Sequence, residues 1–324
     1  MKILLLGGTA FLGRAIAVEA LARGVEVTCL VRGTSAPPEG TTFVRADRDE
    51  EGGLSPVAAQ HWDAVVDVSR QPGHVRRAVR DLSTAHIVFI STTSVYADGD
   101  RLEQDENAPL LTALAGDVMI DMSTYGPAKV ACEEAVRTGR ATWTIIRPGL
   151  IGGPGDISGR SGYYPWRFAH PTGEDVLVPD EPEFPCALID VDDLAAWVVT
   201  AAQDRIAGTF NATGPTTPLA EVLETARRVA GDGAPPIRPV PVEVLRRAGV
   251  ESWMGERSLP LWIDDPQDRY GATADTHAAR AQGLTTRPLE ETLARVLQYE
   301  EHRDVPRRAG LSDLEEQQLR SQLA

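Results

Sequence analysis

Lysine is almost absent from this sequence. Only Lys2 and Lys129 occur among 324 residues, so arginine provides the other thirty of the 32 basic side chains. A GC-rich coding bias would replace lysine in this way. A lysine that persists in mid-chain then indicates a task that arginine cannot perform, because a guanidinium does not release its proton in proteins. Lys129 is therefore the first candidate functional residue.

Cysteine and long apolar runs are also scarce. The three cysteines lie far apart, with neither a CxxC pair nor a spacing to histidine that is typical of zinc sites. We therefore expect no metal site and a reducing, cytoplasmic environment. The first apolar run, residues 3–6, is too short for a signal sequence, and no later run approaches the roughly 18 apolar residues of a membrane span. We expect no membrane association.

Positive charge is in deficit, since the formal net charge is −15. Such a surface repels nucleic-acid phosphates, so we expect no nucleic-acid partner, and an anionic ligand must meet a local positive site. The remaining composition, 42% apolar and 24% charged, excludes collagen-like, disordered and disulfide-rich classes. The length fits one large domain with a smaller one.

Short apolar runs alternate with helical stretches through the first half of the chain. This alternation predicts an α/β protein with a Rossmann-type doubly wound, mostly parallel sheet. The predicted strands are 2–6, 25–31, 42–45, 64–68, 86–90 and 143–146, and the predicted helices are 13–23, 75–82 and 125–138.

The second half of the chain differs in texture. Frequent proline and glycine between residues 152 and 185 predict loops that cover a cleft. Beyond them we expect a strand at 209–211, helices at 191–202, 219–230, 242–248 and 289–299, and a solvated helix in 300–324. We divide the chain into a dinucleotide-binding domain, 1–150 with 186–212, and a smaller, mixed substrate lobe, 151–185 and 213–324.

A glycine turn joins the first predicted strand to the first helix. It has the pattern G-x-x-A-x-x-G, in which Gly7 permits the turn and Gly13 permits close packing of helix on strand. The free amides of such a helix N-terminus bind a pyrophosphate. A purely structural turn is the alternative. The predicted cofactor ligands in this turn are Gly7, Thr9, Ala10, Phe11, Leu12 and Gly13.

The second strand ends without the acidic residue that usually binds the adenosine ribose in NAD-selective sites. Arg32 stands there instead. A guanidinium favours the 2′-phosphate of NADP, so NADP is the preferred cofactor, with NAD open and with Arg32 as a mere surface residue the alternative. Asp47, after the third strand, is a candidate for holding the adenine end.

Tyr125 and Lys129 are four residues apart, which places a phenol and an ammonium on the same face of a helix. A nearby ammonium favours the phenolate form of a tyrosine, as a proton donor working near neutrality requires. The alternative is a core tyrosine beside an exposed lysine. A run of hydroxyl side chains, 91–94, follows the strand at 86–90, at the sheet edge where open α/β proteins bind ligands.

Together these motifs resemble the extended short-chain dehydrogenase/reductase superfamily, in its NAD-dependent epimerase/dehydratase family. The resemblance spans about residues 1–215, and the segments 210–215 and 260–262 are similar to a bacterial reductase-type subgroup. The motifs are the glycine turn, Thr92 four residues before Tyr96, Tyr125 with Lys129, Arg-Pro-Gly at 147–149 with Gly-Pro-Gly at 153–155, and Ile-Asp-Val-Asp-Asp-Leu-Ala at 189–195.

The resemblance implies a nicotinamide cofactor, with Pro148 beside it, and three catalytic residues. Tyr125 would be the acid/base, Lys129 would bind the nicotinamide ribose and favour the phenolate, and Thr92 would bind the reacting oxygen. Hydride would pass between the nicotinamide and a substrate carbonyl or alcohol. It also implies a homodimer formed through helices that include the one with Tyr125.

The sequence departs from the family at places that narrow the reaction. Sugar dehydratases carry Asp-Glu directly after the threonine, where this chain has Thr93 and Ser94. Nucleotide-sugar epimerases commonly have an arginine where this chain has Cys186. The middle glycine of the turn is Ala10, which leaves the choice of cofactor open.

An aromatic segment at residues 162–168 is the candidate substrate wall. Flat apolar side chains suit an organic carbonyl compound, although packing of the small lobe is the alternative. The substrate candidates are Thr93, Tyr164, Trp166, Arg167 and Cys186.

The leading hypothesis is an NAD(P)-dependent oxidoreductase of the carbonyl reductase or alcohol dehydrogenase type that acts on a small metabolite. One alternative is an NAD-dependent nucleotide-sugar epimerase. Another is a non-catalytic, cofactor-binding regulatory protein, since a fold does not settle function.

Overall fold

A seven-stranded parallel sheet forms the centre of the protein. The computed structural model describes residues 1–323, and the strand order is β3-β2-β1-β5-β7-β8-β13 with every neighbouring pair parallel. The order reverses beside β1, as in a doubly wound Rossmann sheet, which confirms the predicted fold class. The bounds are β1 Lys2–Leu6, β2 Glu26–Val31, β3 Thr42–Arg45, β5 Ala64–Asp67, β7 His86–Ile90, β8 Thr142–Pro148 and β13 Gly208–Ala212.

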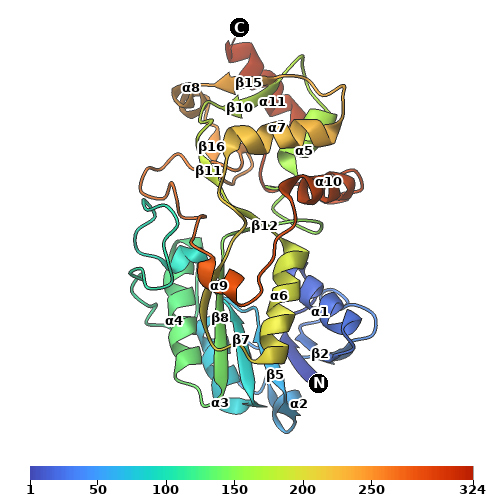
Figure 1. Ribbon diagram of the computed structural model, residues 1–324, viewed down its shortest axis with the longest axis vertical. Coiled ribbons are helices and arrows are strands. Elements are labelled where there is room, and N and C mark those ends of the chain that lie inside the picture. The colour runs from blue at the N-terminus through green and yellow to red at the C-terminus, as the bar shows by residue number, and fades with distance from the viewer. Residues whose placement is uncertain (324) are drawn as a thin grey trace.

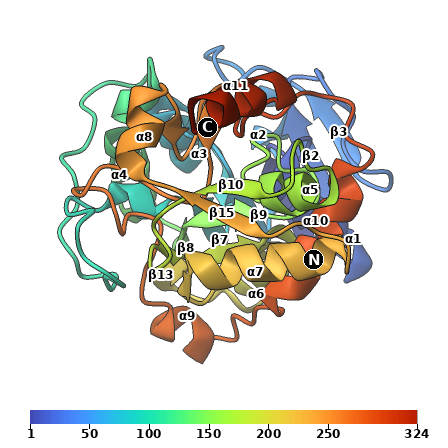
Figure 2. The same ribbon diagram turned by 90° about the horizontal axis from the view of Figure 1, so that it is seen from above.

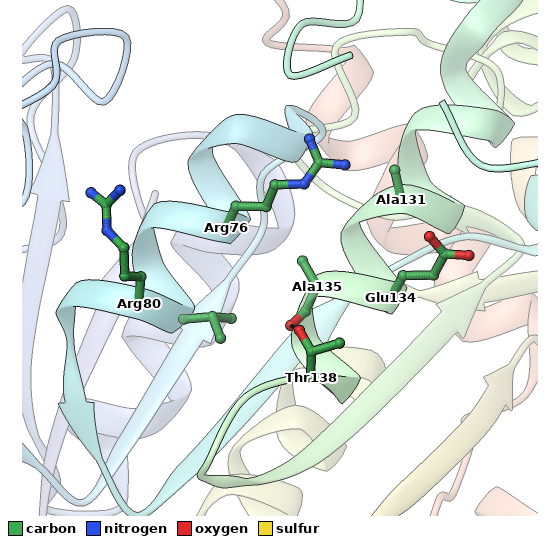
Figure 3. A pocket seen from close by; sticks show the side chains of 7 residues that line it. Arg76, Arg80, Ala131, Glu134, Ala135 and Thr138 are labelled. Carbon is green, nitrogen blue, oxygen red and sulfur yellow. Dashed lines mark hydrogen bonds between the residues drawn. The ribbon is translucent and has the colours of Figure 1, made fainter. Parts of the chain in front are cut away.

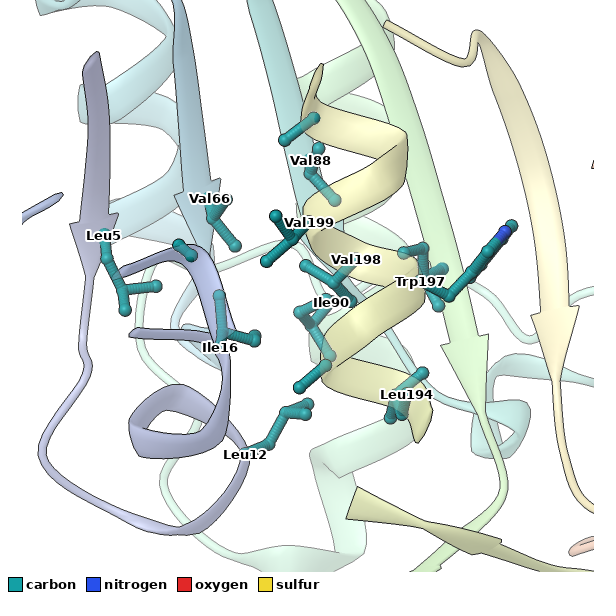
Figure 4. Close-up of a cluster of buried hydrophobic side chains, with 14 of the residues drawn as sticks. Leu5, Leu12, Ile16, Val66, Val88, Ile90, Leu194, Trp197, Val198 and Val199 are labelled. Carbon is teal, nitrogen blue, oxygen red and sulfur yellow. The ribbon is translucent and has the colours of Figure 1, made fainter. Parts of the chain in front are cut away.

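Helices cover both faces of this sheet (Figure 1). The helices α1 (Phe11–Ala22) and α6 (Val191–Asp204) pack on each other over one face, and α3 (Pro72–Asp81) and α4 (Tyr125–Arg137) do so over the other. The sequence of β1 explains why both faces are apolar, because successive side chains of a strand point to opposite sides. Ile3 and Leu5 join the cluster under α1 and α6, whereas Leu4 and Leu6 join a second cluster on the other side. Figure 4 shows the first cluster, with Leu12 and Ile16 of α1 facing Leu194 and Val198 of α6.

A smaller lobe lies beyond the carboxyl ends of the strands, in the upper half of Figure 1 and over the sheet in Figure 2. Its interior is a separate cluster of buried apolar side chains. Its main elements are α5 (Tyr163–Ala169), β10 (Val176–Pro179), α7 (Leu219–Ala230), β15 (Ile237–Val240), α8 (Val242–Arg247), α10 (Leu289–Glu300) and α11 (Asp313–Leu323). Short elements complete the chain: α2 (Ser55–Ala58), α9 (His277–Ala281), β4 (His61–Trp62), β6 (Ser83–Thr84), β9 (Leu150–Gly152), β11 (Pro185–Cys186), β12 (Leu188–Asp190), β14 (Thr217–Pro218), β16 (Glu251–Ser252), β17 (Ser258–Leu259), and the 3-10 turns η1 (Thr93–Val95) and η2 (Met122–Thr124).

Two segments differ from the prediction. Residues 152–185, predicted as loops, contain α5 and β10, because Tyr163 and Phe168 bury one face of a short helix despite the surrounding prolines. The predicted solvated tail contains α11, which instead packs into the lobe through the fully buried Leu319.

The chain returns from the smaller lobe to the sheet after residue 272. Thr213 donates a hydrogen bond to the carbonyl of Ala274, α9 lies against β13, and Ala279 and Leu284 join the core under α1 and α6. The division predicted from the sequence assigns these residues to the smaller lobe.

No helix within residues 1–323 combines the length and apolarity that a bilayer crossing requires. Over the same residues, no group of three or more His, Cys, Asp or Glu side chains is arranged to hold a metal ion.

Candidate functional site

The glycine turn leads from the end of β1 into the uncapped N-terminus of α1. The helix α1 begins at Phe11 without a side-chain cap and without an acidic residue in its first turn, so its positive end is not neutralised by the protein. A Cβ atom on Gly13 would lie 2.8 Å from the amide nitrogen of Gly8, so only glycine permits this close packing. Phe11 adopts a φ of 31°, a strained value for a bulky residue that is typical of functional turns. The turn therefore fits a pyrophosphate, as the sequence predicts for Gly7, Thr9, Ala10, Phe11, Leu12 and Gly13.

Two arginines lie at the end of β2 and β3. Arg32 directly follows β2, is exposed, and has neither an ion pair nor a hydrogen bond to any of residues 1–323. Arg45, which the sequence analysis did not single out, ends the neighbouring β3 and packs its side chain against Gly33. Asp47 is half-buried, and its carboxylate accepts a hydrogen bond from the amide of Asp49. This edge of the sheet therefore carries two free cations where an NAD-selective site carries an acid.

Lys129 lies at the carboxyl ends of β5 and β7. Its ammonium donates hydrogen bonds to the carbonyls of Ser69, at 2.7 Å, and Ile90, at 2.6 Å, and the side chain is buried. It also lies 4.8 Å from the centre of the Phe89 ring. The side chain thus joins α4 to the sheet edge at which doubly wound proteins bind their ligands.

Tyr125 and Thr92 are brought to the same place from different elements. Tyr125 is the first residue of α4, half-buried and one helical turn before Lys129. The next residue, Gly126, touches the Ser94 carbonyl so closely that a Cβ atom would collide with it. Thr92 caps η1 by accepting a hydrogen bond from the Ser94 amide at 3.1 Å. The three residues therefore belong to elements, α4 and η1, that contact each other where β7 ends.

A buried polar network holds α4 in this position. Glu133, one turn beyond Lys129, receives two hydrogen bonds from Arg147 of β8, at 2.9 and 2.7 Å, and one from Ser91. Arg147 also donates to the hydroxyl of Tyr96, which donates to Asn211 of β13. Burial alone would raise the pKa of Glu133, but the hydrogen bonds and charge of Arg147 outweigh it, and that pKa lies below its usual value. The network fixes the helix that carries Tyr125 and Lys129.

A second buried pair lies at the end of β5. Arg48 makes two hydrogen bonds to Asp67, at 2.9 and 2.8 Å. Burial alone would raise the pKa of Asp67, but Arg48 outweighs it and holds that pKa below its usual value, with a further contribution from Lys129. The sheet edge near Lys129 therefore contains an ionised carboxylate that is already paired.

Comparison with known proteins gives one family match over part of the chain and several structural relatives. Residues 3–87 match the NAD dependent epimerase/dehydratase family. A Streptomyces protein, 3-diazoavenalumate denitrifying reductase, is 26% identical over 271 residues, which cover 76% of this chain and 86% of that protein. Among solved structures, the UDP-glucose 4-epimerase of Thermotoga maritima with UDP-glucose has a TM-score of 0.66 at 16% identity, covering 93% of this chain and 99% of its own. The enzyme WbmH of Bordetella bronchiseptica in complex with NAD+ has a TM-score of 0.67 at 17% identity, and the match covers 94% of this chain and 99% of WbmH.

The family match covers residues 3–87, and the solved structures share the fold of almost the whole chain. The resemblance stated from the motifs is thereby confirmed over residues 3–87, which contain the glycine turn and the chain as far as the start of β7. Pro148 ends β8 and is buried, and Thr93 is buried in η1 next to Thr92.

The other substrate candidates lie in the interior of the small lobe. Arg167 is buried and pairs with Glu316 at 2.8 Å and Asp313 at 2.7 Å, so it joins α5 to α11 rather than meeting solvent or Tyr125. Tyr164 is fully buried in the same core. The Cys186 thiol donates to the Leu261 carbonyl at 3.2 Å. Trp166 stacks against the guanidinium of Arg307 at 3.9 Å. Packing, the alternative considered for the aromatic segment, accounts for these contacts.

Two surface grooves lie away from this site. One, of about 380 Å³, runs between α3 and α4 and is drawn in Figure 3. The other, of about 360 Å³, lies between α7 and the loop before α10 and includes Cys186. Neither is lined by Thr92, Tyr125 or Lys129.

Proposed function

We propose that the protein is an NAD(P)-dependent oxidoreductase of the carbonyl reductase or alcohol dehydrogenase type. One observation carries this proposal: the buried Lys129 ammonium, one helical turn after Tyr125, donates a hydrogen bond to the carbonyl of Ile90, two residues before Thr92. This contact supports a site in which Tyr125, Lys129 and Thr92 would together hold a proton and a reacting oxygen.

Each residue has a defined role. The amides of the glycine turn and the end of α1 would hold the cofactor phosphates. Thr92 would bind the substrate oxygen, and Tyr125 would give its phenolic proton to that oxygen in reduction or take it back in oxidation. The positive charge of Lys129 favours the phenolate that remains. When bound, the nicotinamide supplies or accepts the hydride.

Reduction is favoured over the other reactions of this family by the residues after Thr92. Thr93 and Ser94 lack the carboxylates needed for eliminating water. Cys186 is buried against Leu261 and offers no cation to a sugar diphosphate. The Streptomyces relative is a reductase, which agrees with this choice. The structural neighbours that act on UDP-sugars support an NAD-dependent epimerase as the second candidate.

Cofactor exchange distinguishes the two candidates. A reductase releases its oxidised cofactor in each turnover, whereas an epimerase returns the hydride to the same substrate and retains NAD. We expect protein purified and then denatured to release less than one equivalent of nucleotide, and added NADPH to bind reversibly in a fluorescence titration. Stoichiometric NAD in the denatured sample would contradict the reductase and favour the epimerase.

We propose NADP as the cofactor, held by Arg32. We expect Arg32→Asp to shift the ratio of kcat/KM for NADPH over NADH toward NADH by at least about tenfold, because a carboxylate repels the 2′-phosphate and accepts hydrogen bonds from a ribose hydroxyl. Arg140→Asp, a change of an exposed arginine beyond α4, serves as the control for net charge. An unchanged ratio in Arg32→Asp would remove Arg32 from the cofactor site.

We also propose a cytoplasmic homodimer. The three thiols are free and buried, which suits a reducing compartment. The paired outer surfaces of α3 and α4 are the contact that the family resemblance implies, and light scattering gives the mass that tests it.

A further inference from the structure

Arg160 is placed differently from the other arginines of the small lobe. It lies in the loop that leaves β9, and its guanidinium stacks 4.5 Å from the centre of the Trp253 ring. Its Nε donates to the hydroxyl of Ser158 at 3.2 Å. Trp253 itself has a φ of 67°, a strained conformation for so large a residue. The fold therefore holds this guanidinium at a fixed place and bears backbone strain beside it.

The two terminal nitrogens of Arg160 have no protein partner. Although the side chain is partly buried, no carboxylate among residues 1–323 forms an ion pair with it, and neither Nη1 nor Nη2 donates a hydrogen bond there. Arg167, Arg303 and Arg320 of the same lobe each pair with a carboxylate. The nearby Asp156 is occupied by Ser158 and Ser161. A partly buried guanidinium whose Nη1 and Nη2 atoms are both available as donors is suited to binding an oxyanion through two hydrogen bonds.

The loop that carries Arg160 borders the candidate site. The backbone of Gly155 in this loop passes the ring of Phe11 in the glycine turn, with a Cβ position 3.6 Å from the ring. Burial lowers the pKa of the Arg160 guanidinium, and the charges of Asp156 and of the Tyr125 phenol act on it in the opposite sense. The loop that carries Arg160 therefore lies beside the glycine turn.

We infer that Arg160 binds an oxyanion of the substrate, a carboxylate or a phosphate, with its free Nη1 and Nη2 atoms, and so orients the reacting carbon toward Tyr125. This assignment rests on the proposed function, because it concerns the same site. The assignment also agrees with the net charge of −15, because such a protein needs a local cation to bind an anionic metabolite. The substrate class is thus a carbonyl compound or alcohol that carries a negative group.

The test compares matched ligands by titration calorimetry on the full chain with NADP+ present. The ligands are 4-carboxybenzaldehyde, its neutral methyl ester, and UDP-glucose as the phosphate source. We expect one of the two anions to bind the wild type at least about tenfold more tightly than the ester, since a charged bidentate pair is lost with the ester. Arg160→Met abolishes this preference and Arg160→Lys retains part of it. Arg257→Met is the control, because this half-buried arginine bonds only to Ala248 and Gln318.

The outcomes separate the two proposals. Equal binding of anion and ester, no binding of any ligand, or a preference that survives in Arg160→Met overturns the assignment of Arg160. Which anion binds identifies the source of the oxyanion. Hydride transfer is followed separately by NADPH absorbance: Arg160-dependent binding without turnover of any carbonyl contradicts the oxidoreductase and leaves the anion site in place. Turnover of a carbonyl compound without a preference for the anion contradicts the assignment of Arg160 and leaves the oxidoreductase in place.

Discussion

Tyr125→Phe lowers kcat by at least about 100-fold, as the loss of a general acid does. The phenol is the one group at the start of α4 that can give a proton to an oxygen held by Thr92, and phenylalanine keeps the ring while removing that proton. Cofactor affinity stays the same, because the amides of the glycine turn are not altered. Steady-state kinetics and a separate NADPH titration measure the two effects.

Tyr299→Phe is the matched control, since Tyr299 is also half-buried but lies on α10 of the small lobe. We expect Lys129→Arg to lower turnover as well, because a guanidinium is too wide for the space between the Ser69 and Ile90 carbonyls. Normal turnover by Tyr125→Phe would end the proposal that this chain is an oxidoreductase with Tyr125 as its acid.

Glu133→Gln lowers the free energy of unfolding by about 3–5 kcal/mol, the usual cost of leaving one partner of a buried ion pair uncompensated. Glu133 is completely buried, and its carboxylate receives Arg147 and Ser91. Urea denaturation followed by circular dichroism measures the change as a lower midpoint with an unchanged slope.

The control for this change is Glu134→Gln, the adjacent, exposed glutamate of the same helix. A further check is pH. Because the folded protein holds the pKa of Glu133 low, its contribution is present above the unfolded value of about 4.3 and is lost as the pH falls below it. The two unfolding curves should therefore converge in acid. Equal stabilities of wild type and Glu133→Gln at neutral pH would show that the pair does not hold α4.

The half that contains the seven-stranded sheet was predictable from the sequence because its signals are local. The strands β1, β3 and β7 follow from short apolar runs, and the i,i+4 relation of Tyr125 and Lys129 follows from a helix that begins at Tyr125. The buried pair of Glu133 and Arg147 joins residues on different elements, so no local pattern reveals it.

The small lobe was predicted less well because its stability depends on distant partners. Arg167 reads as a surface residue or an anion ligand until Glu316 and Asp313 of α11 are placed beside it. For the same reason α11 reads as a solvated helix. Arg160 was missed because nothing in the neighbouring sequence shows that its guanidinium lacks a carboxylate partner and stacks on the distant Trp253. The available signal was the glycine-rich loop after Pro148.

The return of the chain from the small lobe to the sheet makes the two halves inseparable. A protease that nicked the exposed stretch between residues 264 and 271 would leave two fragments that still migrate as one particle, because the downstream fragment is embedded in both interiors, through Ala279 in one and Leu293 in the other. A gene truncated after β13 would likewise encode the half that contains the sheet with part of its own interior missing. We therefore expect relative movement of the two halves to be limited to bending of the chain segments that connect them, because each segment is packed into an interior at both of its ends.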